Sequence, residues 1–274
     1  MTGNCITAVA GTVCELMGVE GPLDGCGEVI GEFLDLAHRE GVGRVERCVV
    51  FAPDAIGTFM RRKYADLLDR VLEYAPVEVG LCSVVPPKTP VCFASMFTGA
   101  GPAVHGVMPH TRPVVRLDTV FDALVRGGRR VAITAVEGSS IDMIFREREI
   151  DYFSEDYDEG VLRRTVELIE GGEHDFILAY QQGYDDVLHR SGPETDEAIE
   201  AMGRHVASFV EIGRSWESAW RGYDRMIMFC PDHGGHFDAA TGKGAHGDDV
   251  PADMEVTHFC GILKGGRMRD GCKY

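Results

Sequence analysis

Short apolar runs alternate along this chain with segments whose apolar residues recur every three or four positions. Runs of this kind are typical of strands buried on both faces, and strands that alternate with helices form a mainly parallel sheet. The predicted strands are 47–52, 77–85, 130–136, 175–181, 225–230 and 256–263. The predicted helices are 28–39, 58–74, 117–126, 160–170 and 195–220. The sequence therefore predicts an α/β fold, a three-layer αβα sandwich with a mainly parallel central sheet.

The chain is long enough to bury a sizeable core, with 274 residues of which 45% are hydrophobic. It contains no internal repeat, low-complexity tract or Pro-rich linker that would divide it. We therefore expect one domain over 1–274. The acidic and irregular segment 147–159 is expected to be a surface insertion or a small lid.

Charge and targeting signals limit the possible partners. The 27 Lys and Arg residues face 44 Asp and Glu, a net charge of -17, which would repel nucleic acid and anionic membranes. The start of the chain lacks a basic segment before its apolar stretch, and no stretch has the length of a membrane helix. The nine cysteines contain no CxxC pair, as in cytoplasmic proteins with reduced thiols. We expect a cytoplasmic protein and leave its oligomeric state open.

Acidic residues and histidines follow three of the predicted strands. These strand exits carry Asp54, then Asp185, Asp186 and His189, then Asp232, His233 and His236. Ligands of open α/β sheets bind beyond the carboxyl ends of the strands, so these residues are candidates for a site. A single Asp after a strand is more often a helix cap or turn former, but three exits with paired histidines favour metal binding.

Spacing favours the same interpretation. Asp185 and His189 lie four apart and can face one way on a helical turn, while Asp232 and His233 are followed by glycines that permit a ligand loop. His246 lies among further glycines, where the alternative is a flexible surface loop. Asp and His ligands together suit Zn or Mn.

Thr89 is the candidate nucleophile. It precedes Pro90, and a Thr N-cap followed by Pro is a favoured helix start. Capping alone is one interpretation. The other is that a hydroxyl at a helix N-terminus lies where backbone N–H groups favour a phosphate, with a nearby metal lowering the hydroxyl pKa.

The order of these motifs resembles the nucleotide pyrophosphatase/phosphodiesterase branch of the alkaline phosphatase superfamily. The nucleophile motif K-T-F-P-N is similar to 88–92, with T-G at 98–99 and P-x-x-H-G at 102–106. The motif D-x-x-G-H-x-x-G-P is similar to 185–193, S-D-H-G to 231–234 and H-G-Y-D to 246–249. The resemblance runs from about 49 to 262 and leaves the first 45 residues outside.

Carried over by position, the resemblance implies two divalent metal ions, Zn or alternatively Mn. One ion would bind Asp185, His189 and His246, and the other Asp54, Asp232, His233 and the Thr89 oxygen. It also implies a phosphoester hydrolase, acting as a phosphodiesterase or phosphomonoesterase on a small phosphorylated substrate through a phosphothreonine. Of the other histidines, His236 would support a ligand, and the rest would be structural or exposed: His105, His110, His174 and His258.

The sequence departs from the family motif at Cys92, where the motif has Asn. One helical turn beyond Thr89, Cys92 is expected to line the phosphoryl pocket, and core packing is the alternative. A phosphonate hydrolase or a phosphomutase would use the same metal pair. A metal-binding or phosphoprotein-binding module without catalysis is the rival from another class. A sulfatase is disfavoured, because the chain lacks the Cys/Ser-x-Pro-x-Arg motif.

Overall fold

The computed structural model describes residues 5–108 and 111–267. Its main sheet has seven strands in the order β2-β9-β6-β1-β5-β3-β4. Neighbouring strands are parallel except at β9, which runs antiparallel to both β2 and β6. The strands are β1 (Arg47–Pro53), β2 (Val77–Cys82), β3 (Val131–Val136), β4 (Asp151–Glu155), β5 (Phe176–Gln181), β6 (Arg225–Phe229) and β9 (Glu255–Leu263). A separate hairpin pairs β7 (His236–Asp238) with β8 (Lys243–Ala245).

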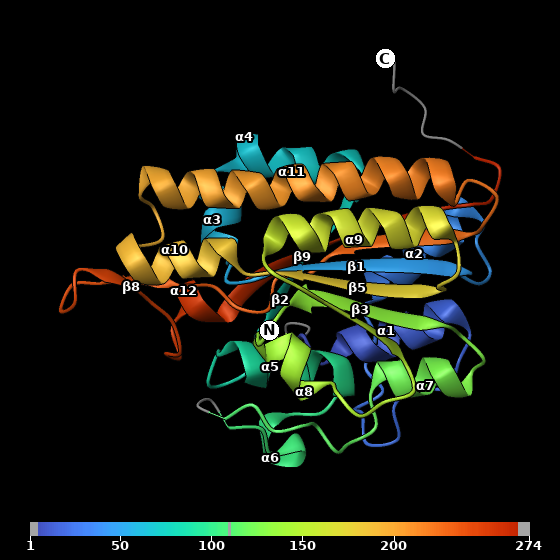
Figure 1. Ribbon diagram of the computed structural model, residues 1–274, viewed down its shortest axis with the longest axis horizontal. Helices are drawn as coiled ribbons and strands as arrows, with labels where there is room; N and C mark the ends of the chain where they lie inside the picture. The colour runs from blue at the N-terminus through green and yellow to red at the C-terminus, as the bar shows by residue number, and fades with distance from the viewer. Residues whose placement is uncertain (1–4, 109–110, 268–274) are drawn as a thin grey trace.

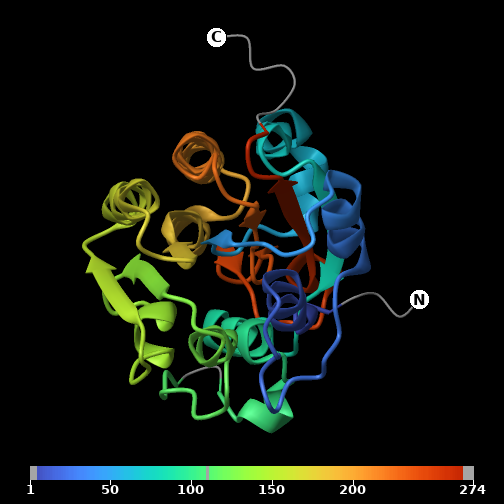
Figure 2. The same ribbon diagram turned by 90° about the vertical axis from the view of Figure 1, so that its right-hand side faces the viewer.

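Helices cover both faces of the sheet, which gives the predicted three layers (Figures 1 and 2). One face carries α1 (Ala8–Met17), α2 (Gly31–Glu40), α5 (Thr89–Thr98), α7 (Val120–Arg126) and α8 (Ser140–Ile144). The other carries α3 (Thr58–Lys63), α4 (Ala65–Leu68), η1 (Asp69–Glu73), α9 (Asp158–Gly171), α10 (Gly183–Ser191) and α11 (Asp196–Ala219). The short helices α6 (Pro102–His105) and α12 (Pro251–Met254) complete the described chain. The α/β prediction is confirmed.

The alternation of side chains along each central strand creates two separate cores. In β1, Val50 packs in the core under α1 and α5, whereas Val49 and Phe51 pack under α11. Because successive side chains point to opposite faces, a strand between two helical layers must be apolar at every position. All seven residues of β1 are buried, which explains the uninterrupted apolar runs of the sequence.

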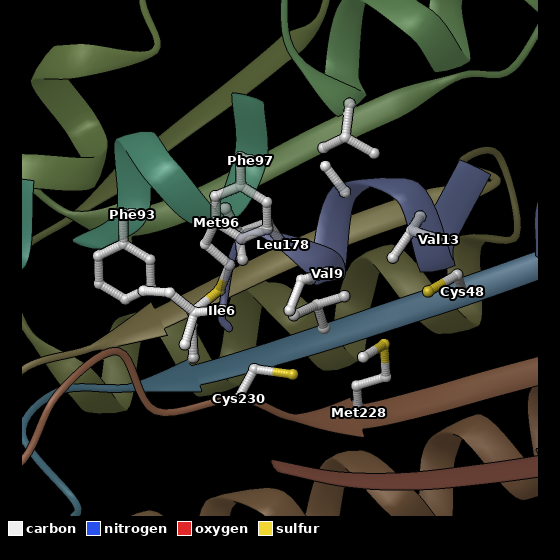
Figure 3. Packing of buried hydrophobic residues seen from close by; sticks show 14 of the residues in the cluster. Ile6, Val9, Val13, Cys48, Phe93, Met96, Phe97, Leu178, Met228 and Cys230 are labelled. Atoms are coloured by element: carbon white, nitrogen blue, oxygen red, sulfur yellow. The ribbon is translucent and has the colours of Figure 1, made fainter. Parts of the chain in front are cut away.

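The N-terminal helix α1 belongs to one of these cores. Ile6, Val9 and Val13 lie among the side chains of α5 and the central strands, as Figure 3 shows. All three are fully buried. Although the family resemblance leaves this segment out, the segment covers part of the sheet.

Two segments differ from their predicted form. The helix expected over 58–74 divides into α3, α4 and η1, because the backbone of Tyr64 leaves the helical region at φ −113° and ψ 45°. The segment 147–159, expected to be irregular, contains the edge strand β4 beside β3. Its residues are exposed or half-buried, so no apolar run marked it in the sequence.

Among the described residues, no helix is both long enough and apolar enough to cross a membrane. The longest helix, α11, has 24 residues but carries charged residues along its exposed face.

Candidate two-metal site

The site lies at the carboxyl ends of three neighbouring parallel strands. β1 has β5 on one side and β6 on the other, so the residues that follow these strands reach the same edge of the sheet. Asp54 follows β1, Asp185 lies in the first turn of α10 after β5, and Asp232 follows β6. The structure therefore brings together the three strand exits that the sequence singled out.

The first cluster consists of Asp54, Asp232 and His233, all buried, with ligand atoms within 4.8 Å of one another. His233 Nε2 lies 3.5 Å from Asp54 Oδ1 and 3.4 Å from Asp232 Oδ2. The backbone N–H of Ala55 donates to Asp232 Oδ1 over 3.3 Å. Ala55 has φ 63°, a strained conformation for a residue with a Cβ, and such strain persists only where the surroundings enforce it.

Thr89 turns its hydroxyl toward this first cluster. Its Oγ1 lies 3.3 Å from Asp54 Oδ2 and 3.3 Å from His233 Nε2. Helix α5 begins at Thr89, with Lys88 at the N-cap position and no side-chain cap hydrogen bond. The prediction of a Thr N-cap is therefore wrong by one residue. Because the hydroxyl does not cap the helix, it is free to act within the cluster.

The second cluster consists of Asp185, His189 and His246, again with ligand atoms within 4.8 Å. Both histidine Nε2 atoms lie 3.5 Å from Asp185 Oδ1. Asp185 and His189 share one face of α10, as their spacing predicted, and His246 comes from the loop after β8. The two clusters adjoin, because the rings of His233 and His246 stack with centroids 4.0 Å apart.

All three histidines present Nε2 to the site. Their Nδ1 atoms lie 2.9 Å from the carbonyl of Gly234 for His233, 2.9 Å from that of Pro87 for His246, and 3.4 Å from that of Gly244 for His189. A carbonyl can only accept, so each Nδ1 carries the proton and each Nε2 holds a lone pair. Metal-binding histidines are held in this way.

The closeness of these lone pairs favours a cation between them. His189 Nε2 and His246 Nε2 are 2.9 Å apart, although neither can donate to the other in this tautomer. Asp185 Oδ1 and Asp232 Oδ2 are buried without a hydrogen-bond partner. Unpaired buried carboxylates are costly unless a cation offsets their charge, so the donor set fits divalent metal ions.

Burial shapes the protonation of both clusters. Burial raises the pKa of Asp54 and of Asp232 far above the usual range, and the neighbouring carboxylates add to the shift. Burial, followed by the charge of Asp232, raises the pKa of Asp185 to about 8. Burial also lowers the pKa of His233 to about 3 and that of His246 still further. The histidines are thus neutral at physiological pH, the form that can bind a metal.

Sequence reasoning did not single out two residues beside the clusters. The Tyr180 hydroxyl, at the end of β5, donates a short hydrogen bond to Asp54 Oδ2. Lys88 donates from Nζ to the carbonyl of His246, and its charge contributes to the lowered pKa of His189 after the effect of burial. Lys88 precedes Thr89 in the quoted motif, whereas nothing in the sequence distinguished Tyr180 from a core aromatic.

Cys92 lies one turn beyond Thr89 and is fully buried in the core. Its Sγ is 3.1 Å from Ser83 Oγ, which donates to the carbonyl of Asp232 over 2.7 Å. Cys92 thus lies below the first cluster, and its burial fits the packing alternative better than direct contact with a substrate.

The other described histidines lie outside the two clusters. His105 bonds Ser95, His174 bonds Asp151, and His258 bonds the carbonyl of Pro231. His236 faces Asp253, while His110 lies outside the described residues.

A scan against protein-family models and a search of curated proteins both find no match. Solved structures do match. Phosphonoacetate hydrolase from Sinorhizobium meliloti 1021, in complex with phosphonoformate, has a TM-score of 0.54 at 20% identity, covering 73% of this chain and 59% of that one. Murine ectonucleotide pyrophosphatase/phosphodiesterase 5, in complex with AMP, has a TM-score of 0.55 at 12% identity, covering 72% and 59%.

The C-terminal periplasmic domain of phosphoethanolamine transferase EptC from Campylobacter jejuni has a TM-score of 0.55 at 14% identity, covering 80% of each chain. The chain thus spans less than two thirds of the length of the matched hydrolase and phosphodiesterase chains. These neighbours are all members of the alkaline phosphatase superfamily, and the chain has the alkaline phosphatase-like fold that its motifs predicted.

Proposed function

We propose that the protein is a metal-dependent phosphoester hydrolase that uses Thr89 as its nucleophile. The observation that supports this most is the direction of the Thr89 hydroxyl, which lies 3.3 Å from both Asp54 Oδ2 and His233 Nε2. A hydroxyl is a weak nucleophile until a neighbouring base or metal activates it. The first cluster surrounds this hydroxyl with groups suited to that purpose.

Two divalent cations, Zn or alternatively Mn, are part of the proposal. Bound ions would offset the carboxylate charge, lower the pKa of the Thr89 hydroxyl and stabilise charge on a phosphoryl group. Asp54, Asp232 and His233 would hold one ion together with the Thr89 oxygen. The residues proposed for the other ion are Asp185, His189 and His246.

The residues of the site would have distinct roles in the reaction. Thr89 Oγ1 forms a bond to phosphorus while the ester P–O bond breaks, and the alcohol leaves with the proton that the hydroxyl loses. Water next cleaves the Oγ1–P bond, which restores the hydroxyl and releases phosphate from a monoester substrate or a phosphomonoester from a diester. The dipole of α5, which begins at Thr89, would favour an anion at this end of the helix, and the hydrogen bond from Tyr180 holds Asp54 in place.

The substrate class is a small phosphorylated or phosphonylated molecule. Phosphonate hydrolysis is the second candidate, because two similar structures are of phosphonoacetate hydrolase bound to phosphonoformate or phosphonoacetate. A phosphomutase would use the same residues. The cytoplasmic location expected from the sequence stays a prediction.

A substrate screen tests the proposal. Chelator-treated protein is supplied with Zn²⁺ or Mn²⁺ and offered p-nitrophenyl phosphate, bis-p-nitrophenyl phosphate and phosphonoacetate, with release of nitrophenol or phosphate as the readout. We expect metal-dependent turnover of at least one ester, and Thr89→Ala should lose at least about a thousandfold in kcat. Thr111→Ala, at an exposed position, serves as the matched control.

Turnover of phosphonoacetate alone would favour the phosphonate hydrolase. If none of the three compounds reacts although the protein binds metal, the rival module without catalysis is favoured. Equal rates for the parent and Thr89→Ala would rule out the proposed nucleophile.

A further inference from the structure

Asp253 is a buried carboxylate that lies between the loops bearing the metal ligands. It belongs to the short helix α12, immediately before β9, and its exposure is 0%. Neither its position after a strand nor any motif of the resemblance marked it in the sequence. Its contacts nevertheless reach a loop of each cluster.

One set of contacts holds the loop that follows His246. Asp253 Oδ2 accepts the backbone N–H of Gly247 over 2.9 Å and that of Asp248 over 3.0 Å. Gly247 has φ 118°, a conformation that only glycine adopts without strain. The carboxylate thus fixes an unusual backbone turn directly after a ligand of the second cluster.

The other set of contacts holds the loop that carries Asp232 and His233. Asp253 Oδ1 lies 2.7 Å from His236 Nδ1, and the Asp253 carbonyl accepts the N–H of Gly234 over 2.8 Å. The backbones pack closely here, because a Cβ on Gly234 would lie 2.0 Å from the carbonyl oxygen of Ala252. Gly234 is the residue directly after His233 of the first cluster.

We infer that Asp253 is a positioning residue that fastens the His246 loop to the Asp232–His233 loop and so sets the two metal clusters against each other. The inference rests on the proposed function, because the clusters are taken as metal sites. The carboxylate and the backbone carbonyl of Asp253 together accept four hydrogen bonds, two from each loop. Hydrogen bonds to a carboxylate are stronger than those between neutral groups, so these contacts can hold both loops.

Asp253, His236 and Asp248 also lie within 4.8 Å of one another and could be read as a third metal site. Two observations favour the positioning role instead. Both oxygens of Asp253 already accept hydrogen bonds, and the Asp248 side chain is 72% exposed and 3.6 Å from His236 Nε2. The ligand atoms that such an ion would need are therefore engaged or turned to solvent.

The test uses Asp253→Asn in the full chain, with Asp248→Asn as the matched control. The amide offers one acceptor and one donor group where three N–H groups need acceptors, so the fastening cannot be complete. Hydrogen exchange on metal-free protein should show faster exchange at the amides of 247, 248 and 234 in Asp253→Asn alone. Titration with Co²⁺, followed by its visible absorption, should show affinity lowered at least about tenfold, as for other residues that orient metal ligands.

Unchanged exchange at these amides would overturn the fastening, and lost protection with unchanged Co²⁺ affinity would overturn the positioning role. Parent protein that binds no Co²⁺ would instead refute the proposed function, while the exchange data still report on the loops. If Asp253→Asn does not fold, His236→Leu removes one of the two hydrogen bonds between Asp253 and the Asp232–His233 loop. Its Co²⁺ affinity should fall severalfold, and an unchanged affinity would overturn the inference.

Discussion

In each histidine of the two clusters, Nδ1 lies against a backbone carbonyl, so the main chain decides which nitrogen faces the site. For His246 this carbonyl belongs to Pro87, two residues before Thr89 in the nucleophile segment. Lys88 reaches back to the carbonyl of His246. Thr89 and His246 therefore hold each other in place through neighbouring residues, and a shift of one loop would disturb both.

Cys92 gives a prediction at the scale of one residue. Its thiol is fully buried, and Ser83 Oγ is its one side-chain partner among the described residues. Cys92→Asn would place an amide where most of its hydrogen-bonding groups lack partners, which costs about 1 to 3 kcal/mol. We expect a lower melting temperature without faster turnover, and Cys26→Asn, at an exposed position, is the control. Faster turnover at unchanged stability would show instead that Cys92 contacts the substrate.

The residues of the two clusters could be named from the sequence, but their support could not. The sequence identifies Asp54, Asp185 and Asp232 as candidates because they follow strands, and parallel strands bring their carboxyl ends to one edge of the sheet. Tyr180 and Asp253 look like a core aromatic and a surface acid in the sequence. Their roles depend on contacts between segments far apart in the chain, and no local pattern encodes such contacts.

At the scale of an element, helix α10 is held by a buried network at its N-terminus. His205 Nε2 accepts the N–H of Tyr184 over 3.0 Å, and its Nδ1 donates to Gln181 Oε1 over 2.9 Å. Asp158 accepts the N–H groups of Gln182 and Gly183. These bonds satisfy the unpaired N–H groups of the first turn, which carries Asp185 toward the second cluster.

Replacing His205 with Leu should destabilise the protein by about 1 to 3 kcal/mol at pH 7, since it leaves the Tyr184 N–H buried without an acceptor. Burial lowers the pKa of His205 from 6.5 to about 3 in the folded protein. As the pH falls, the unfolded chain binds a proton at His205 before the folded protein does. The contribution of neutral His205 to the free energy of unfolding is therefore full above pH 6.5 and declines toward pH 3.

The difference in unfolding free energy between the parent and His205→Leu should therefore shrink by about 1 to 3 kcal/mol from pH 7 to pH 4. Urea unfolding at both pH values measures it, and the exposed His38 provides a control variant, His38→Leu. A difference that stays constant with pH would contradict the assignment of a neutral, buried His205.

Element boundaries followed from the sequence where burial was complete. The central strands and α11 match their predicted ranges closely, because residues packed on both faces or on a wide helical face must be apolar. Two predicted segments differ from the structure. The helix predicted over 58–74 is broken at Tyr64, whose non-helical backbone no periodic pattern indicates. The edge strand in 147–159 is exposed or half-buried and so has no apolar run. Exposed edges are where sequence patterns carry the least information.

For the whole molecule, metal-free protein holds three buried carboxyl groups at one edge of the sheet, where burial raises their pKa values and makes their ionised form costly. Zn²⁺ or Mn²⁺ should raise the melting temperature, because an ion that binds only the folded state, present at a hundred times its Kd, adds about 2.7 kcal/mol per site.

Elemental analysis should find about two ions per chain, one for each of the two ligand clusters. Asp232→Ala should lose one ion, with Asp238→Ala, in the separate β7–β8 hairpin, as the control. No stabilisation by either metal would contradict the two-metal assignment.

The claim that joins fold, site and function is that Thr89 carries the phosphoryl group during turnover. Metal-loaded protein mixed with p-nitrophenyl phosphate, or with whichever ester the screen shows to react, is quenched in acid and analysed by peptide mass spectrometry. We predict one added phosphoryl group on the peptide that begins α5, located at Thr89 and missing when chelator is present. Steady turnover with no phosphoryl group on Thr89, and with Thr89→Ala as fast as the parent, would contradict the claim.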